Sequence, residues 1–224
     1  MYLTPDVLSK VDPNMEVSLF FNRKIIQPGT FVPSKTSAEP ATLTIQPFNK
    51  GERLVTIVVV DADVPNLDKD GFDIRCHYLA VNIPISPTNT TVSLELSPEK
   101  RGEQLVLPWL PPFAQKGSPY HRLGVFVLEQ PNNAPIDVKP MTIPTESTDE
   151  RGRNDFVQRD GFNLRSFVGR YKLTPTGVHM FRTQWDEEMA EVMTKAGIPG
   201  ADVEFVRKKI PPLPYKKKDG ARYR

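Results

Sequence analysis

The 224-residue sequence has little cysteine, little histidine and no long apolar run. Its single cysteine, Cys76, excludes an internal disulfide framework and suits a reducing compartment. No apolar run approaches the ~20 residues of a membrane-spanning helix, and the N-terminal residues show neither a secretory apolar core nor an Arg-rich amphipathic pattern. A chain of this length buries roughly 70% of its unfolded surface. We therefore expect one large domain whose core needs no disulfide or metal crosslink.

The sequence also lacks the common catalytic and cofactor motifs. It contains no GxSxG, no Gly-rich phosphate loop and no paired CxxC. Cys76 precedes His77, but neighbouring strand residues point to opposite faces, so a Cys–His nucleophile pair is not expected. No activated nucleophile can be named. We predict a protein without enzymatic activity, catalytic residues, cofactor or metal.

Proline is abundant, and the 23 prolines separate short apolar runs, which favours strands joined by ordered turns. Strands are predicted for residues 16–21, 41–46, 53–61, 75–83, 91–96 and 124–130. The run 54–60 is almost continuously apolar, which indicates a central strand covered on both faces. We expect residues 61–65 to end that strand, because Pro65 has no N–H to donate to a neighbouring strand.

Two amphipathic helices are predicted late in the chain. Residues 163–171 carry apolar side chains at helical spacing, with Asn163 as a possible N-cap. Residues 186–196 repeat the spacing, with acids in the first turn and Gly197 as a stop. The charged segment 145–160 indicates an exposed loop ahead of the first helix.

Two acids and two histidines form the candidate site within the strands. If the strand continues through Asp63, alternation places Asp61 and Asp63 on one face. His77 and His121 could lie near Asp61 at one end of the sheet. Such a cluster has the groups for acid–base chemistry or a mixed oxygen and nitrogen metal site, although the spacing matches no short metal signature. An anion-binding or structural polar pocket and unrelated positions are the alternatives, and His179 is expected on a strand face without a special role.

Charge divides the chain into two parts. Residues 205–224 hold eight Lys or Arg and one Asp, a net charge of +7, whereas the other 204 residues hold 21 basic and 26 acidic side chains, a net charge of −5. The prolines of segment 210–214 favour an extended backbone. We therefore expect a domain over residues 1–200 and a Pro-rich, basic extension over residues 201–224.

The basic extension is either a solvated tail or a nucleic-acid contact. Cations interleaved with tyrosines fit phosphate contacts and stacking on unpaired bases, and such binding weakens with salt. The candidate phosphate-binding residues are Arg207, Lys208, Lys209, Lys216, Lys217, Lys218, Arg222 and Arg224.

Three separated motifs resemble the phosphatidylethanolamine-binding protein family. Residues 61–65, DADVP, resemble its D-P-D-x-P motif, and residues 76–82, CHYLAVN, look like the histidine-bearing strand that follows. Residues 116–122, KGSPYHR, resemble its G-x-x-x-H-R segment. The resemblance covers roughly residues 4–196. It implies a mainly β fold, in which a large antiparallel sheet packs on a smaller sheet with short peripheral helices.

The departures from the family pattern bear on ligand binding. Family members that bind phosphoryl head groups line an anion pocket with side chains that this sequence partly replaces. The replacements are Ala62 for proline, Arg75 and Cys76 for Trp and His, Pro119 for glycine and Leu123 for tyrosine. Because Asp61, Asp63, His77 and His121 remain, we interpret them as a vestigial ligand pocket that supports loop geometry.

The same departures and the C-terminal extension resemble the branch of the family found in the mitochondrial large ribosomal subunit. That resemblance implies a non-catalytic ribosomal component in the mitochondrial matrix, with ribosomal RNA and neighbouring ribosomal proteins as partners. The branch begins with a longer N-terminal region, so this chain either lacks it or is a fragment. The alternative is a soluble module that binds phosphoryl head groups or phosphorylated ligands through Asp61, His77 and His121.

Overall fold

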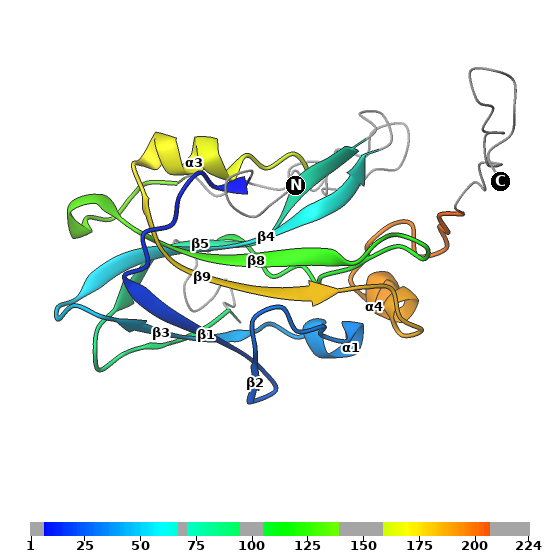
Figure 1. Ribbon diagram of the computed structural model, residues 1–224, viewed down its shortest axis with the longest axis horizontal. Coiled ribbons are helices and arrows are strands. Elements are labelled where there is room, and N and C mark those ends of the chain that lie inside the picture. Colours follow the sequence, from blue (N-terminus) through cyan, green and yellow to red (C-terminus); the bar gives the residue numbers. More distant parts are fainter. Residues whose placement is uncertain (1–6, 67–70, 95–104, 139–158, 207–224) are drawn as a thin grey trace, which may run out of the picture.

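The computed structural model describes residues 7–66, 71–94, 105–138 and 159–206, and it is mainly β (Figure 1). The strands are β1 (Met15–Phe21), β2 (Lys24–Ile26), β3 (Thr42–Pro47), β4 (Arg53–Asn66), β5 (Gly71–Ile85), β6 (Thr91–Ser93), β7 (Leu105–Leu107), β8 (His121–Glu129) and β9 (Thr174–Thr183). The helices are α1 (Ser34–Ser37), the 3-10 turn η2 (Pro131–Asn133), α3 (Leu164–Tyr171) and α4 (Met189–Lys195).

The strands form two antiparallel sheets that stack on each other. The larger sheet has the order β7-β5-β4-β8-β9, and the smaller has the order β2-β1-β3-β6. Helix α3 lies on the outer side of the larger sheet, while α1 and α4 lie together at one end (Figure 1). The predicted fold class, a larger antiparallel sheet packed on a smaller one with short helices at the periphery, is confirmed.

Strand β4 is central in the larger sheet, as its continuous apolar sequence predicts. Its odd-numbered residues from Val55 to Val59 join the core between the two sheets. Its even-numbered residues Val58, Val60 and Ala62 join a second core, which α3 covers. Because both faces are covered by other elements, no position from Val55 to Val60 needs a polar side chain for solubility.

The prediction that residues 61–65 end the strand is wrong. Strand β4 runs on to Asn66, and Pro65 pairs in register with Phe72 of β5. Strand β8 accompanies β4 only as far as Asp61, which pairs with Leu123. Beyond that point β4 has a single neighbouring strand, and a proline without an N–H is tolerated on such an edge.

The two late helices are confirmed with shifted starts. Asn163 caps α3, since its side chain accepts a hydrogen bond of 2.9 Å from the Ser166 N–H. Helix α4 begins at Met189, later than residue 186, because the Asp186 carboxylate instead accepts bonds from the Ser34 backbone N–H and hydroxyl. Gly197, at φ +67, ends it as predicted.

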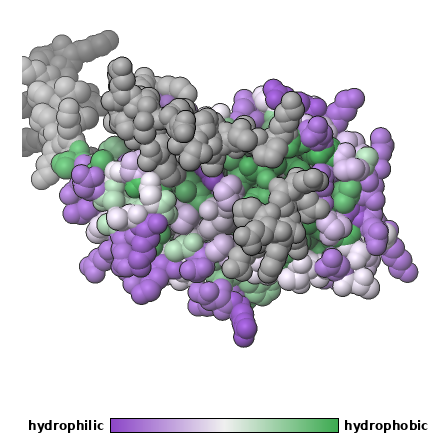
Figure 2. Space-filling view, turned by 180° about the vertical axis from the view of Figure 1, so that it is seen from behind, coloured by the Kyte–Doolittle hydropathy of each residue, from purple (hydrophilic) through white to green (hydrophobic). Residues whose placement is uncertain are grey.

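The outer surface is unevenly polar. Seen from behind, hydrophilic residues line the lower border of the molecule, and hydrophobic residues gather toward the middle and upper right (Figure 2). Within the described ranges, none of the helices has the length and apolar character needed to cross a bilayer.

Candidate functional site

The candidate site is built where β4, β5 and β8 lie side by side. A register shift on β5 pairs Val59 with Tyr78 but Val60 with Cys76, so His77 between them is the extra residue of a β-bulge. His121 is the first residue of β8, close to the end of its pairing with β4. These two features bring His77 and His121 to the same end of the sheet as Asp61.

Asp61 and His121 form a buried pair. The His121 Nδ1–H donates to Asp61 Oδ2 at 2.6 Å, and the backbone N–H of Asp63 donates to Asp61 Oδ1 at 2.9 Å. The side chains of Asp61 and His121 are 0% and 3% exposed. Burial opposes the charge on Asp61, but His121, His77 and the Asp63 N–H outweigh it and lower the Asp61 pKa below its ordinary value.

Asp63 takes a different partner from Asp61. Its carboxylate accepts three hydrogen bonds from Arg122, at 2.9 Å from the backbone N–H, 2.6 Å from Nε and 2.5 Å from Nη2. The hydrogen bonds to Asp63 raise the Arg122 pKa against its partial burial. Regular strand alternation would place the two acids on one face, but the pairing is irregular between Asp61 and Val64. Asp61 contacts His121, whereas Asp63 contacts Arg122.

His77 is neutral and closed off from solvent. Its Nδ1 lies 2.9 Å from the Leu110 carbonyl oxygen, which only accepts, so Nδ1 carries the proton. Complete burial lowers the His77 pKa to about 4, although Asp61 opposes the change. The ring also lies edge-on to Phe113, with 6.2 Å between centroids. In this neutral tautomer the buried Nε2 offers a lone pair rather than a proton.

Two arginines beside His77 were not among the predicted site residues. Arg159 is 5% exposed and donates to the carbonyls of Cys76, His77 and Pro108. Burial lowers its pKa. Arg75 makes a two-pronged ion pair with Asp160 and stacks 4.5 Å above the Phe113 ring.

Residues 145–158 of the segment predicted to be an exposed loop lie outside the described residues. At Arg159 the prediction is wrong, because that guanidinium finds three carbonyl acceptors at the end of the sheet. The sequence pattern did not mark Arg159. It marked Arg75 only as a basic residue at a position that is aromatic in the family pattern.

The cluster is better suited to structure than to chemistry. Burial raises the Cys76 pKa to about 12, so this thiol stays protonated at neutral pH. Within the described ranges, no three His, Cys, Asp or Glu side chains lie close enough to hold a metal ion. His77 Nε2 and His121 Nε2 are buried without a hydrogen-bond partner in that part of the chain. Asp61, His77 and His121 therefore converge, whereas Asp63 is bound to Arg122.

His179 lies on β9, and its Nε2 is 3.0 Å from the Ile26 carbonyl, away from this cluster. The eight tail residues from Arg207 to Arg224 that were predicted to bind phosphate lie outside the described residues.

The segment before the tail packs on the domain next to this site. Ile198 joins an apolar cluster with Phe113 and Met189. Further on, the Phe205 N–H donates to the Lys116 carbonyl at 2.7 Å, and Lys116 Nζ pairs with Glu204 at 3.0 Å. Gly117, at φ +82, permits this approach, since a Cβ there would lie 2.0 Å from the Phe205 carbonyl oxygen. The chain is thus fixed to the sheet end as far as Phe205.

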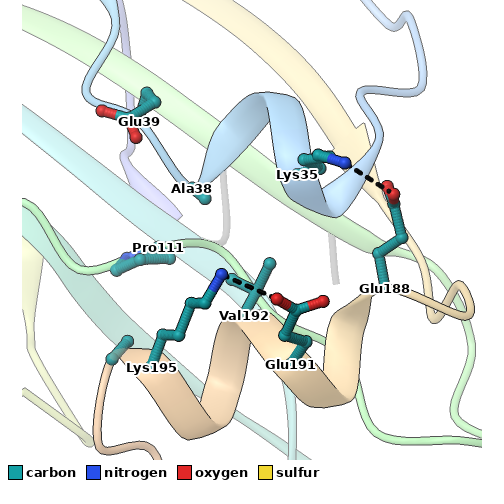
Figure 3. Close-up of a pocket in the computed structure, with 9 residues that line it drawn as sticks. Lys35, Ala38, Glu39, Pro111, Glu188, Glu191, Val192 and Lys195 are labelled. Carbon is teal, nitrogen blue, oxygen red and sulfur yellow. Dashed lines mark hydrogen bonds and ion pairs between the residues drawn. The ribbon is translucent and has the colours of Figure 1, made fainter.

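A separate cavity of about 420 Å³ lies between α1 and α4 (Figure 3). It contains two ion pairs, Lys35 with Glu188 at 3.2 Å and Lys195 with Glu191 at 2.7 Å. Both pairs are largely exposed, and pairs of this kind contribute little to stability. None of the predicted site residues lines this cavity.

A curated relative matches most of this chain. Over 191 residues the chain is 27% identical to "Large ribosomal subunit protein mL38" of Schizosaccharomyces pombe. The matched region covers 84% of this chain and 55% of the relative. The chain thus spans about half the length of that curated relative.

Among solved structures, the CG7054 solution structure has a TM-score of 0.50 and 21% identity, covering 89% of this chain and 99% of that one. The phosphatidylethanolamine-binding protein from Plasmodium vivax has a TM-score of 0.49 and 14% identity, with 81% and 92% covered. The first of these likenesses supports the fold. A sequence profile described as phosphatidylethanolamine-binding protein matches residues 22–172, well over half of the chain. This chain belongs to the phosphatidylethanolamine-binding protein family.

Proposed function

We propose that this chain is a non-catalytic, structural component of the large subunit of the mitochondrial ribosome. The observation that carries the proposal is the 27% identity, over 84% of the chain, to a protein named for the large ribosomal subunit. The closed Asp61–His121–His77 cluster supports it, since its acid and its imidazoles are buried, and the pKa of the neighbouring Cys76 thiol is raised by burial, so no side chain there is activated as a nucleophile.

The charge distribution supports contact with ribosomal RNA. The last 20 residues carry a net charge of +7 against −5 for the rest of the chain, and phosphate backbones attract such segments. In this proposal the domain, residues 1–200, packs on neighbouring ribosomal proteins. The extension, residues 201–224, contacts RNA phosphates through its Lys and Arg side chains, and the Glu204–Lys116 contact holds its base on the domain.

The test is association of the full chain with mitochondrial large subunits. The tagged chain is expressed in cells, and lysates are separated on sucrose gradients at low and high salt. We expect the chain to sediment with large subunits and a variant that lacks residues 207–224 to dissociate at lower salt. A chain that runs only at the top of the gradient at every salt concentration contradicts the ribosomal role. Unchanged association of the shortened variant in high salt removes the tail from the proposal.

The alternative, binding of a phosphoryl ligand, has support from family membership but less from the site. Neutral His77 presents a lone pair at Nε2, which repels a phosphate oxygen instead of donating to it. Calorimetry of the full chain with phosphoethanolamine separates the two functions. Saturable heat that disappears in His121→Ala supports the phosphoryl-binding module, and an absence of heat at millimolar ligand contradicts it.

A further inference from the structure

Two exposed aromatic rings and an arginine form a cluster on the surface, distinct from the buried histidines. The Arg182 guanidinium lies 4.1 Å from the centroid of the Phe31 ring and 5.4 Å from that of Tyr120. The two rings meet edge to face, with 5.8 Å between centroids. Phe31 is 40% exposed and Tyr120 is 47% exposed. We call Phe31, Tyr120 and Arg182 the Arg182 cluster.

The backbone fixes the geometry of this cluster. The loop that carries Phe31 runs beside β9, where the Val32 N–H donates to the Arg182 carbonyl and the Arg182 N–H donates to the Thr30 carbonyl, each at 2.9 Å. The Arg182 side chain is tied to the same loop, since its Nε donates to the Gly29 carbonyl at 2.6 Å. One side chain and two backbone bonds therefore hold the guanidinium over the Phe31 ring before any partner arrives, which lowers the entropy cost of binding.

The cluster lies on the outer face of the larger sheet. Arg182 pairs in register with Arg122 of β8, so both side chains leave the same face. The next pair, Leu123 with Phe181, belongs to the core between the sheets, which places the two arginines on the opposite face.

The two neighbouring arginines differ in charge compensation. Asp63 binds Arg122 through both carboxylate oxygens. Arg182 has no ion pair with a carboxylate among the residues that the structure describes. Its guanidinium carbon lies over the rings of Phe31 and Tyr120. Within the described ranges, the positive charge of Arg182 is therefore without a carboxylate partner at this surface.

The C-terminal segment approaches the same end of the molecule. Lys116 lies four residues before Tyr120 and binds both Glu204 and the backbone N–H of Phe205. The end of β9, α4 and the last described residues all lie toward the same end of the molecule (Figure 1). The basic residues that begin at Arg207 therefore follow directly on a segment fixed near the Arg182 cluster.

We infer that the Arg182 cluster is a stacking site for an unpaired nucleotide of RNA. A nucleotide combines a flat base with a negative phosphate, and the cluster combines two accessible rings with one uncompensated guanidinium. A carboxylate-rich peptide would use the charge but leave the exposed rings without a flat partner, so RNA is the better match. This inference rests on the proposed function and extends its RNA contact from the tail to the folded domain.

Fluorescence anisotropy of a labelled oligouridine with the full chain tests the inference. The test variants are Tyr120→Leu and Phe31→Leu, which remove a ring, and Arg182→Lys, which keeps the charge but loses the planar group. Phe48→Leu and Arg170→Lys are the matched controls, because Phe48 is 64% exposed elsewhere and Arg170 lies exposed in the last turn of α3. Loss of a stacked base is expected to weaken binding by roughly 5- to 150-fold, with the controls and thermal unfolding unchanged.

The outcomes separate this inference from the ribosomal role. If the parent and all three test variants bind RNA equally, the inferred stacking site is wrong. The proposed function then still stands. A parent that associates with large subunits but binds no oligouridine also overturns it. If the test variants lose association with large subunits while their affinity for oligouridine stays that of the parent, the cluster binds a protein, and the inference is again wrong. A selective loss of RNA affinity in all three test variants supports it.

Discussion

Tyr120, His121 and Arg122 are consecutive residues, yet they belong to two regions that differ in burial and in charge balance. His121 is 2% exposed and is paired with Asp61 between the sheets. Tyr120 is 47% exposed and lies beside Arg182 on the outer face. The interior region has its charges matched within the fold, whereas the outer region has a cation and two rings in contact with solvent.

This difference separates the two proposals: the inner region is the one that we interpret as a vestigial ligand pocket, and the outer region is the one that we infer to bind RNA. A buried acid–histidine pair contributes to stability through internal hydrogen bonds, and nothing in solution competes for it. Exposed rings and an uncompensated charge contribute little to stability, but they are the groups that binding interfaces use. Variants of the inner region should therefore change the free energy of unfolding, and variants of the outer region should change affinity for RNA.

The largest effect is expected from Asp61→Ala. It leaves the His121 Nδ1–H and the Asp63 N–H buried without an acceptor, so we expect a loss of about 3–5 kcal/mol in the free energy of unfolding. Urea denaturation measures it. Asp61→Asn is the control, because its amide oxygen still accepts one of the two bonds and it should lose less. If both variants unfold within about 1 kcal/mol of the parent, the inner region is not a stability element.

The second prediction concerns pH. Burial lowers the His77 pKa from 6.5 to about 4, so the unfolded chain binds more protons than the folded one between these values. Stability is then complete above pH 6.5 and falls as the pH drops toward 4, by an amount of up to about 3 kcal/mol for this residue. The lowered pKa of His179 acts in the same direction. The stability that Asp61 contributes through its lowered pKa is lost only at more acidic pH, as the pH falls below its ordinary 3.8.

Urea denaturation between pH 4 and 7 measures this dependence in the parent and in His77→Gln. Glutamine can still donate to the Leu110 carbonyl but does not titrate, so the slope of stability against pH should be smaller in the variant. An equal slope in the two proteins would show that His77 is not desolvated in the folded state. Affinity of the Arg182 cluster for RNA should not follow this slope, because its cation does not titrate in this range.

Sequence reasoning could place the inner region but not its details. The order of the predicted strands allowed Asp61, His77 and His121 to meet at one end of the sheet but left unrelated positions open, and the structure brings the three together. The bulge at His77 and the irregular pairing after Asp61 depend on competition between neighbouring strands, which no local pattern records. Arg159 was missed for a related reason, because its carbonyl partners lie 51 to 83 residues away in sequence.

The outer region was missed altogether. Phe31, Tyr120 and Arg182 come from three distant segments, and their contact depends on a loop running beside β9. Isolated aromatic and basic residues are ordinary features of a sequence, so only the fold shows that they form one cluster.

The smallest expected effect, at Gly117, tests how the tail is joined to the outer region. Gly117→Ala places a Cβ 2.0 Å from the Phe205 carbonyl oxygen, at φ +82. Gly161→Ala is the matched control, because Gly161 has φ +71 with nothing within 4 Å of its added Cβ. The control should lose about 1 kcal/mol of stability from the left-handed backbone alone. Gly117→Ala should lose about 1–3 kcal/mol and also release the segment that ends at Phe205.

Hydrogen exchange of the Phe205 N–H, which donates to Lys116 at 2.7 Å, reports that release directly. Exchange should accelerate in Gly117→Ala and stay at the parent rate in Gly161→Ala. Affinity for oligouridine should fall in Gly117→Ala alone, because a released tail no longer begins at a fixed distance from the Arg182 cluster and the two contacts lose their high effective concentration. Faster exchange with unchanged affinity would mean that the tail and the cluster bind RNA independently. Unchanged exchange would mean that the Phe205 contact moves aside without breaking.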